Sequence, residues 1–239
     1  MTAKIKRELA GSAAAFGGAL LCGLGLMLLL EAGALVFVRV SGEAWVGLGG
    51  VGFAVGALLV MFIVNIVSVS SSFSMALSMG CTRRAYFLSS ECAMVLWTLA
   101  AALLALPAAL ADEALRPVLA PADARPLLEA NPMLGLYRDH FWTVALGALS
   151  VVALGQFFGA VIWKWGVTGY WIIWGGSMLL GALASYAADA RAGWLYAAAR
   201  ALVLRCAAFS AVQWAALWAG AIAVLFLAVW LFLRRASLK

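Results

Sequence analysis

Few side chains in this sequence are of the kinds that commonly do chemistry. It has one histidine, His140, and four cysteines with no CxxC or other metal-ligand spacing. It has no GxxxxGKS or GxxxxGKT phosphate loop, no HExxH zinc motif and no GxSxG serine elbow. We therefore predict that the chain is not an enzyme, holds no metal or cofactor and does not hydrolyse ATP by itself.

Polar side chains inside apolar stretches are the next candidates, because a polar group in the hydrocarbon core is costly unless it is used or paired. Asn65, Ser68 and Ser72 recur at three- and four-residue spacing, so they share one helix face. That face should contact protein or a water-filled cleft, as interhelical glue or as part of a translocation path. Glu31 has a simpler alternative, a position at the outer headgroups. The full set of candidates for a path or a helix interface is Glu31, Asn65, Ser68, Ser72, Gln156 and Gln213.

A third group lies in residues 74–90, a polar stretch between apolar runs that we call the Gly80 segment. Its first residues favour helix, Gly80 suits a left-handed helix end, and Thr82 can cap a new helix. Arg83 and Arg84 follow, and as charges alone they could simply orient the neighbouring spans. The segment also holds apolar residues that should lie outside the hydrocarbon core, where such side chains need a protein groove or a membrane surface. These residues are Met75, Met79, Tyr86 and Phe87.

The composition indicates an integral membrane protein. Of 239 residues, 67% are hydrophobic and only 11% are charged, and the mean hydropathy is +1.06. Several apolar runs reach the roughly 20 residues that a membrane-spanning helix needs, without the short alternating strands of a β-barrel. The net charge of +6 comes from basic residues in ones and twos at the ends of these runs. That distribution argues against nucleic-acid binding.

We predict one all-α transmembrane domain, residues 1–239, with six spanning helices. A tight hairpin is expected around Lys164, between the fourth and fifth spans. Residues 68–90 should join the second and third spans, and the proline-rich residues 111–141 should form an external loop without a long helix. Residues 189–209 hold three arginines, each costing about 2.5–3.5 kcal/mol at mid-bilayer, and should form a short external or re-entrant helix. The predicted spans are residues 12–38, 45–67, 92–110, 142–163, 168–187 and 210–233.

Charge counting orients these spans with both termini in the cytoplasm. The seven basic residues assigned to the outside are balanced by seven acidic ones. The cytoplasmic segments hold nine basic residues against Glu8 and Glu91, as the positive-inside rule requires. The nine are Lys4, Lys6, Arg7, Arg83, Arg84, Lys164, Arg234, Arg235 and Lys239.

Residues 77–87 read Leu-Ser-Met-Gly-Cys-Thr-Arg-Arg-Ala-Tyr-Phe. This stretch resembles the pattern Leu-Ser-x-Gly-x-Thr/Ser-Arg-Arg/Lys-x-x-Phe-Phe in membrane subunits of ABC transporters of the ABC-2, or type V exporter, class. The sequence match is close in this stretch, and the rest of the chain resembles the family only in the number and orientation of its spans. The basic N-terminus, the Lys164 hairpin and residues 189–209 also look like the family's interfacial helix, second intracellular contact and external re-entrant helices.

The resemblance implies that the Gly80 segment is a coupling helix that docks on a separate ATPase subunit. Two ATPase subunits, which bind ATP and Mg, and a second membrane subunit, identical or related, would complete a complex in the bacterial cytoplasmic membrane. The apolar residues would supply contact, the two arginines would pair with acidic groups, and Gly80 would set the turn. The implied interface comprises Met75, Ser78, Met79, Gly80, Thr82, Arg83, Arg84, Tyr86 and Phe87.

One alternative stays open, a non-transporting membrane anchor or sensor that recruits a cytoplasmic partner through the same segment. A lipid-modifying enzyme is disfavoured because no nucleophile, metal cluster or carboxylate pair is apparent. Substrate identity is not readable, although a largely apolar path favours lipid-like, drug-like or peptide substrates over a small ion or sugar.

Overall fold

The computed structural model describes residues 2–41, 45–46, 48–119, 128–129, 132–188 and 193–234, which form seven helices and two very short strands. Six helices are long and apolar enough to cross a membrane, and the seventh, α6, has only 14 residues. The predicted all-α fold is confirmed, and the six candidate spans indicate a multi-pass membrane protein. The helices are α1 (Thr2–Ser41), α2 (Gly49–Ser78), α3 (Arg83–Leu119), α4 (Pro132–Trp165), α5 (Val167–Ala188), α6 (Trp194–Ala207) and α7 (Ala211–Arg234).

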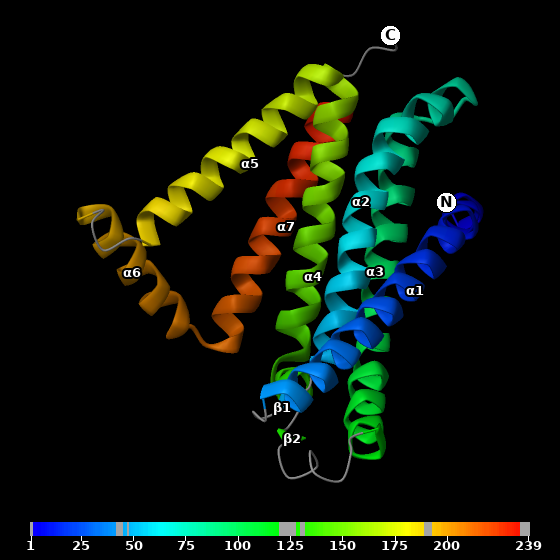
Figure 1. Ribbon diagram of the computed structural model, residues 1–239. Coiled ribbons are helices and arrows are strands. Elements are labelled where there is room, and N and C mark those ends of the chain that lie inside the picture. The colour runs from blue at the N-terminus through cyan, green and yellow to red at the C-terminus, as the bar shows by residue number, and fades with distance from the viewer. Residues whose placement is uncertain are drawn as a thin grey trace.

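Helix α2 is the centre of the bundle. It packs against α1, α3 and α4, and α7 packs along the far side of α4. Helices α5 and α6 extend away from this group before the chain returns as α7 (Figure 1). The α2–α3 turn, the α4–α5 turn and the C-terminus lie at one end of the molecule (Figure 1). The strands β1 (Trp45–Val46) and β2 (Leu128–Glu129) pair in parallel at the other end.

The α1–α2 contact is a close approach of two backbones. A Cβ atom added to Gly52 would lie 2.7 Å from the Leu30 side chain, and one added to Gly56 would lie 3.0 Å from the Cα of Gly23. A Cβ at Gly23 would lie 2.7 Å from the carbonyl oxygen of Phe53. The GxxxG pair at 52 and 56 is therefore used within this chain, where absent side chains permit backbone contact.

A second glycine pair brings α4 against the opposite region of α2. A Cβ at Gly155 would lie 2.6 Å from the carbonyl oxygen of Phe62, and one at Gly159 would lie 2.6 Å from that of Ile66. Because the obstacles are backbone atoms, a side chain at either glycine would force the two helices apart. Helix α2 is thus clamped between α1 and α4.

The helices extend beyond the predicted spans around the Gly80 segment. Helix α2 begins at Gly49, not residue 45, because Trp45 and Val46 are in β1. It runs on to Ser78, and α3 begins at Arg83 instead of residue 92. Residues 68–90 therefore contain no separate coupling helix. The physical reason is packing, since the apolar sides of both helix ends enter the same core cluster.

The predicted external loop, residues 111–141, is largely helical where the structure describes it. Helix α3 continues through Pro117 to Leu119, and α4 begins at Pro132. Pro132 occupies the first helical position, where its missing N–H is not needed. The expectation of a loop over 111–141 was therefore wrong at both ends of the segment, because α3 runs on through Pro117 and α4 has already begun at Pro132. Helix α4 bends at His140, whose backbone is non-helical (φ −137°, ψ 28°).

The C-terminal half follows the predicted connections. The hairpin after Lys164 turns at Gly166, whose φ of 61° is in the left-handed region. A short helix, α6, forms where residues 189–209 predicted one, and Arg200 and Arg205 are both exposed on it. The N-terminal basic residues belong to the same continuous helix as the first span, so α1 has no separate interfacial helix.

Candidate functional site

The Gly80 turn is a well-defined helix stop. Gly80 has a φ of 78°, its N–H donates to the Leu77 carbonyl at 3.0 Å, and the Cys81 N–H donates to the Ala76 carbonyl at 2.9 Å. This pattern is the Schellman motif, which satisfies the last carbonyls of a helix and favours glycine at the left-handed position. The predicted helix end at Gly80 is confirmed.

Thr82 starts the next helix as predicted. Its Oγ1 accepts a hydrogen bond from the Ala85 N–H at 3.2 Å, and its carbonyl accepts one from the Tyr86 N–H at 2.9 Å. The N–H groups in the first turn of a helix have no acceptor within the helix, and a threonine in this position supplies one. Only four residues therefore separate two long helices, and the turn has a defined shape.

Aromatic packing fixes this turn to the bundle. Phe73 on α2 is fully buried, with ring centroids 5.1 Å from Tyr86 on α3 and 4.9 Å from Trp163 on α4. The Trp163 Nε1 also donates to Ser74 Oγ at 2.8 Å. Phe87 packs on Trp230 of α7, with centroids 5.3 Å apart. The turn is thus in contact with α4 and α7 as well as its own two helices.

The two arginines of the segment have different surroundings. Arg83 Nη1 donates a hydrogen bond to the Arg234 carbonyl at 3.1 Å, which satisfies a carbonyl at the C-terminus of α7. Arg84 is exposed. At the same end, Lys164 lies over the rings of Trp165 and Phe232 at 5.0 and 4.7 Å. Several of the basic residues assigned to the cytoplasm therefore lie at the same end of the bundle as the Gly80 turn.

The predicted interface residues divide into exposed and buried sets. Met75 and Met79 are 58% and 71% exposed, whereas Tyr86 is 2% exposed. Phe87 is partly buried against α7. Tyr86 and Phe87 therefore pack in the core in this conformation and are not available to a partner. The predicted residues left accessible to a partner are Met75, Ser78, Met79, Gly80, Thr82 and Arg84.

A second candidate site is a buried polar cluster between α3 and α4. Gln156 and Glu91 are 1% and 6% exposed. With its amide nitrogen toward Glu91, Gln156 donates to both carboxyl oxygens at 2.8 Å, and its amide oxygen accepts from Ser90 Oγ at 3.2 Å. Glu91 was missed as a candidate because the third span was expected to start after it. A start at Arg83 would have placed Glu91 two turns inside.

A small cavity of about 60 Å³ adjoins this cluster and reaches α1 and α2. Asn65 and Ser68 line it, together with Ser12 and Ser90, and Ser72 lies half-buried one turn further along α2. The Asn65 Nδ2 donates to the Met61 carbonyl of its own helix at 2.8 Å. Across the cavity, Trp97 Nε1 donates to Ser12 Oγ at 2.7 Å. The polar face predicted for α2 therefore faces other helices at Asn65 and Ser68.

Glu31 closes a helix end at the opposite side of the bundle. Its Oε1 accepts hydrogen bonds from the N–H groups of Leu48 at 3.0 Å and Gly49 at 2.7 Å, at the start of α2. The Asp112 side chain of α3 lies beside it, because both side chains border Gly49: a Cβ added there would lie 2.5 Å from Asp112 Oδ1 and 3.0 Å from Glu31 Cγ. Asp112 is 1% exposed. Glu31 thus joins α1, α2 and α3, and sequence reasoning missed Asp112 because residue 112 was assigned to a loop.

Gln213 likewise has a local structural role. Its Oε1 accepts from the Ser210 N–H at 2.8 Å, and its own N–H donates to Ser210 Oγ at 3.3 Å. This reciprocal pair is a capping box at the start of α7, with the Ser-x-x-Gln spacing that defines one. The spacing was visible in the sequence, and it is the signal that assigns Gln213 to capping.

Comparison of the chain with known proteins found no matching family model, no matching curated protein and no matching solved structure. The Gly80 turn and the buried polar cluster are the features on which a function can be argued.

Proposed function

We propose that this chain is the transmembrane subunit of an ATP-driven ABC exporter of the ABC-2 class, which docks a separate ATPase subunit through the Gly80 segment. The observation that carries the proposal is the geometry of the turn. Two exposed methionines and an exposed arginine stand on a sharply defined helix–turn–helix at the basic end of the bundle. Together with the residue pattern at 77–87, this arrangement supports a docking element.

The packing beneath the turn supports a role in transmission. Phe73 and Tyr86 connect the segment to α4 through Trp163, and Phe87 and Arg83 connect it to α7. A partner can shift the membrane helices only if it binds one arrangement of the turn better than another. A rigid turn that contacts four helices would convert such differential binding into movement of the bundle.

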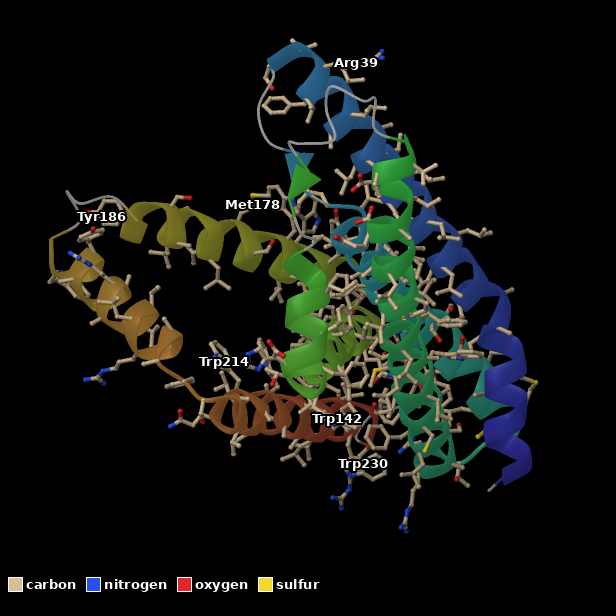
Figure 2. All side chains as sticks on the ribbon, turned by 90° about the horizontal axis from the view of Figure 1, so that it is seen from below. Arg39, Trp142, Met178, Tyr186, Trp214 and Trp230 are labelled. Atoms are coloured by element: carbon tan, nitrogen blue, oxygen red, sulfur yellow. The ribbon has the colours of Figure 1, made fainter. Side chains whose placement is uncertain are left out.

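The proposed complex also contains a second membrane subunit, two ATPase subunits that bind ATP and Mg, and surrounding lipid. Helix α5 supports the presence of a second membrane subunit. Most of its large apolar residues are exposed, and Tyr186 lies at the end far from α4 (Figure 2). A second copy or a related subunit would bury this helix.

Charge reversal at Arg84 tests the docking role. Arg84→Glu should abolish or strongly reduce copurification of Mg-dependent ATPase activity with the tagged chain, because acidic groups on the partner would be repelled. Arg83 is a poor test residue, since it also caps α7. The matched control is Arg200→Glu on the exposed face of α6, which should leave copurification unchanged. Intact copurification with Arg84→Glu, at normal membrane insertion, would reject the proposal.

The anchor or sensor alternative shares the docking step and differs in the use that is made of ATP hydrolysis after docking. Buried Glu91 and Gln156 favour a transporter, because intramembrane ionisable groups commonly mark transport paths. ATP hydrolysis in liposomes that rises with an added amphiphilic substrate would support transport. Hydrolysis that no substrate stimulates would support the anchor.

A further inference from the structure

A cavity larger than the one beside Asn65 is separate from the Gly80 turn and from the buried polar cluster. It has a volume of about 650 Å³ and lies between α2, α3, α4 and the beginning of α7, in the half of the bundle opposite the Gly80 turn. Ligand pockets typically have volumes of about 300–1,000 Å³. Its walls contain many alanines and one glycine, Gly147, so the space exists because small residues line it.

The two ends of the cavity differ in chemistry. Near the start of α4 it is lined by Tyr137, His140 and Thr143, whose side chains can all form hydrogen bonds. Burial raises the pKa of the Tyr137 hydroxyl, so this group stays protonated and can donate. Elsewhere the lining is largely apolar and includes Met61 and Val151, and the hydroxyl of Thr98 already donates to the Met94 carbonyl at 2.8 Å.

The cavity's polarity follows its depth in the membrane. The apolar stretch of α4 begins at Asp139 and that of α7 at Ala211, so the polar end lies at the boundary of the hydrocarbon core. From residue 139 to Val151 a helix rises about 18 Å, at 1.5 Å per residue. That is close to half of the roughly 30 Å core. The cavity therefore has about the depth of one leaflet.

Tryptophans form one wall near the polar end. Trp214 and Trp218 stack with ring centroids 6.0 Å apart, and Trp218 lies against Gly147 of α4. Figure 2 shows Trp214 at the beginning of α7. Aromatic rings with one polar edge suit the boundary between hydrocarbon and headgroups. They give an apolar chain a flat surface next to the hydrogen-bonding groups.

We propose that this cavity binds an amphiphile with a single acyl chain, whose chain lies along α2, α3 and α4 and whose hydrogen-bonding head group lies at Tyr137, His140 and Thr143. A two-chain phospholipid is larger than a pocket of this volume, and a pure hydrocarbon would leave the polar end unsatisfied. Binding here needs no ATPase, so it stands or falls separately from docking at the Gly80 segment. In an exporter, the same class of molecule would be the expected cargo.

A photoreactive lysophosphatidylcholine with a diazirine at the end of its chain tests the site on the full chain in nanodiscs. Mass spectrometry should find crosslinks near Met61 and Val151 that excess unlabelled lysophosphatidylcholine removes. Ala148→Phe places a ring in the space that the acyl chain would occupy and should lower this competed labelling about tenfold or more. Ala223→Phe, exposed on α7, is the matched control and should have no effect. Labelling that excess lipid does not compete would overturn the proposal.

A nearly isosteric variant tests the site even if the Ala148→Phe protein misfolds. Thr143→Val removes one hydroxyl and should weaken lysophosphatidylcholine binding about two- to tenfold, the value of one hydrogen bond. A diazirine-bearing hexadecane should label this variant and the wild type equally. Wild-type labelling by hexadecane as strong as that by the lysolipid, or equal loss of both probes with Thr143→Val, would contradict a head-group site.

Discussion

At the scale of single residues, several polar side chains close helix ends. Glu31 accepts the first N–H groups of α2, Thr82 caps α3, and Gln213 caps α7 from its N-terminal side. Arg83 satisfies a carbonyl at the other end of α7. In a membrane, helix termini that enter protein need such partners because water is scarce there. The polar groups left for transport or ligand contact are consequently fewer.

Glu31 offers a residue-scale prediction. Glu31→Ala leaves the Leu48 and Gly49 N–H groups at the start of α2 without their acceptor, so the free energy of unfolding should fall by about 1–3 kcal/mol. Glu31→Gln is the control. It retains an acceptor oxygen and adds an N–H donor toward Asp112, and it should unfold like the wild type. Unfolding in dodecyl sulfate titrations measures both, and an Ala variant as stable as the wild type would refute this role.

At the scale of elements, α2 is the common partner of the bundle. Its contact with α1 depends on Gly52 and Gly56, and its contact with α4 depends on Gly155 and Gly159 of the other helix. The same helix ends in the Gly80 turn. A displacement of that turn is therefore passed along α2 to both neighbours, because close-packed backbones have little space to absorb it.

The α2–α4 contact can be tested with one added side chain. Gly159→Val places a Cβ against the Ile66 carbonyl, which no rotamer change can relieve, and should destabilise the protein by about 1–3 kcal/mol or more. Gly220→Val on α7, where a Cβ meets nothing within 4 Å, controls for the change in helix propensity. Thermal unfolding in detergent compares the two. Equal melting temperatures for both variants would show that the contact is loose.

At the scale of the whole molecule, the chain has a packed part and an extended part. Helices α1 to α4 and α7 share the core clusters, whereas α5 contacts chiefly α4 and α6. Apolar surface of this extent is typical of a protein or lipid interface. The proposed second membrane subunit would occupy it.

Cysteine crosslinking tests this arrangement. In a background in which the four native cysteines are replaced by alanine, Met178→Cys on α5 should form a crosslinked dimer on oxidation if the partner is a second copy. Val224→Cys, at a similarly exposed position on α7, is the control and should crosslink much less. Equal crosslinking at the two positions would indicate random collisions and reject α5 as the interface.

The sequence by itself determined the local features: the six apolar runs, the left-handed stop at Gly80, the cap at Thr82 and the hairpin after Lys164. A membrane helix satisfies its own backbone, so its existence and its breaks are encoded nearby. The tertiary structure alone decided which residues meet. It paired Glu91 with Gln156, brought Glu31 and Asp112 together beside Gly49, and showed that both glycine pairs make helix contacts within one chain. Those partners are far apart in sequence, and only packing brings them together.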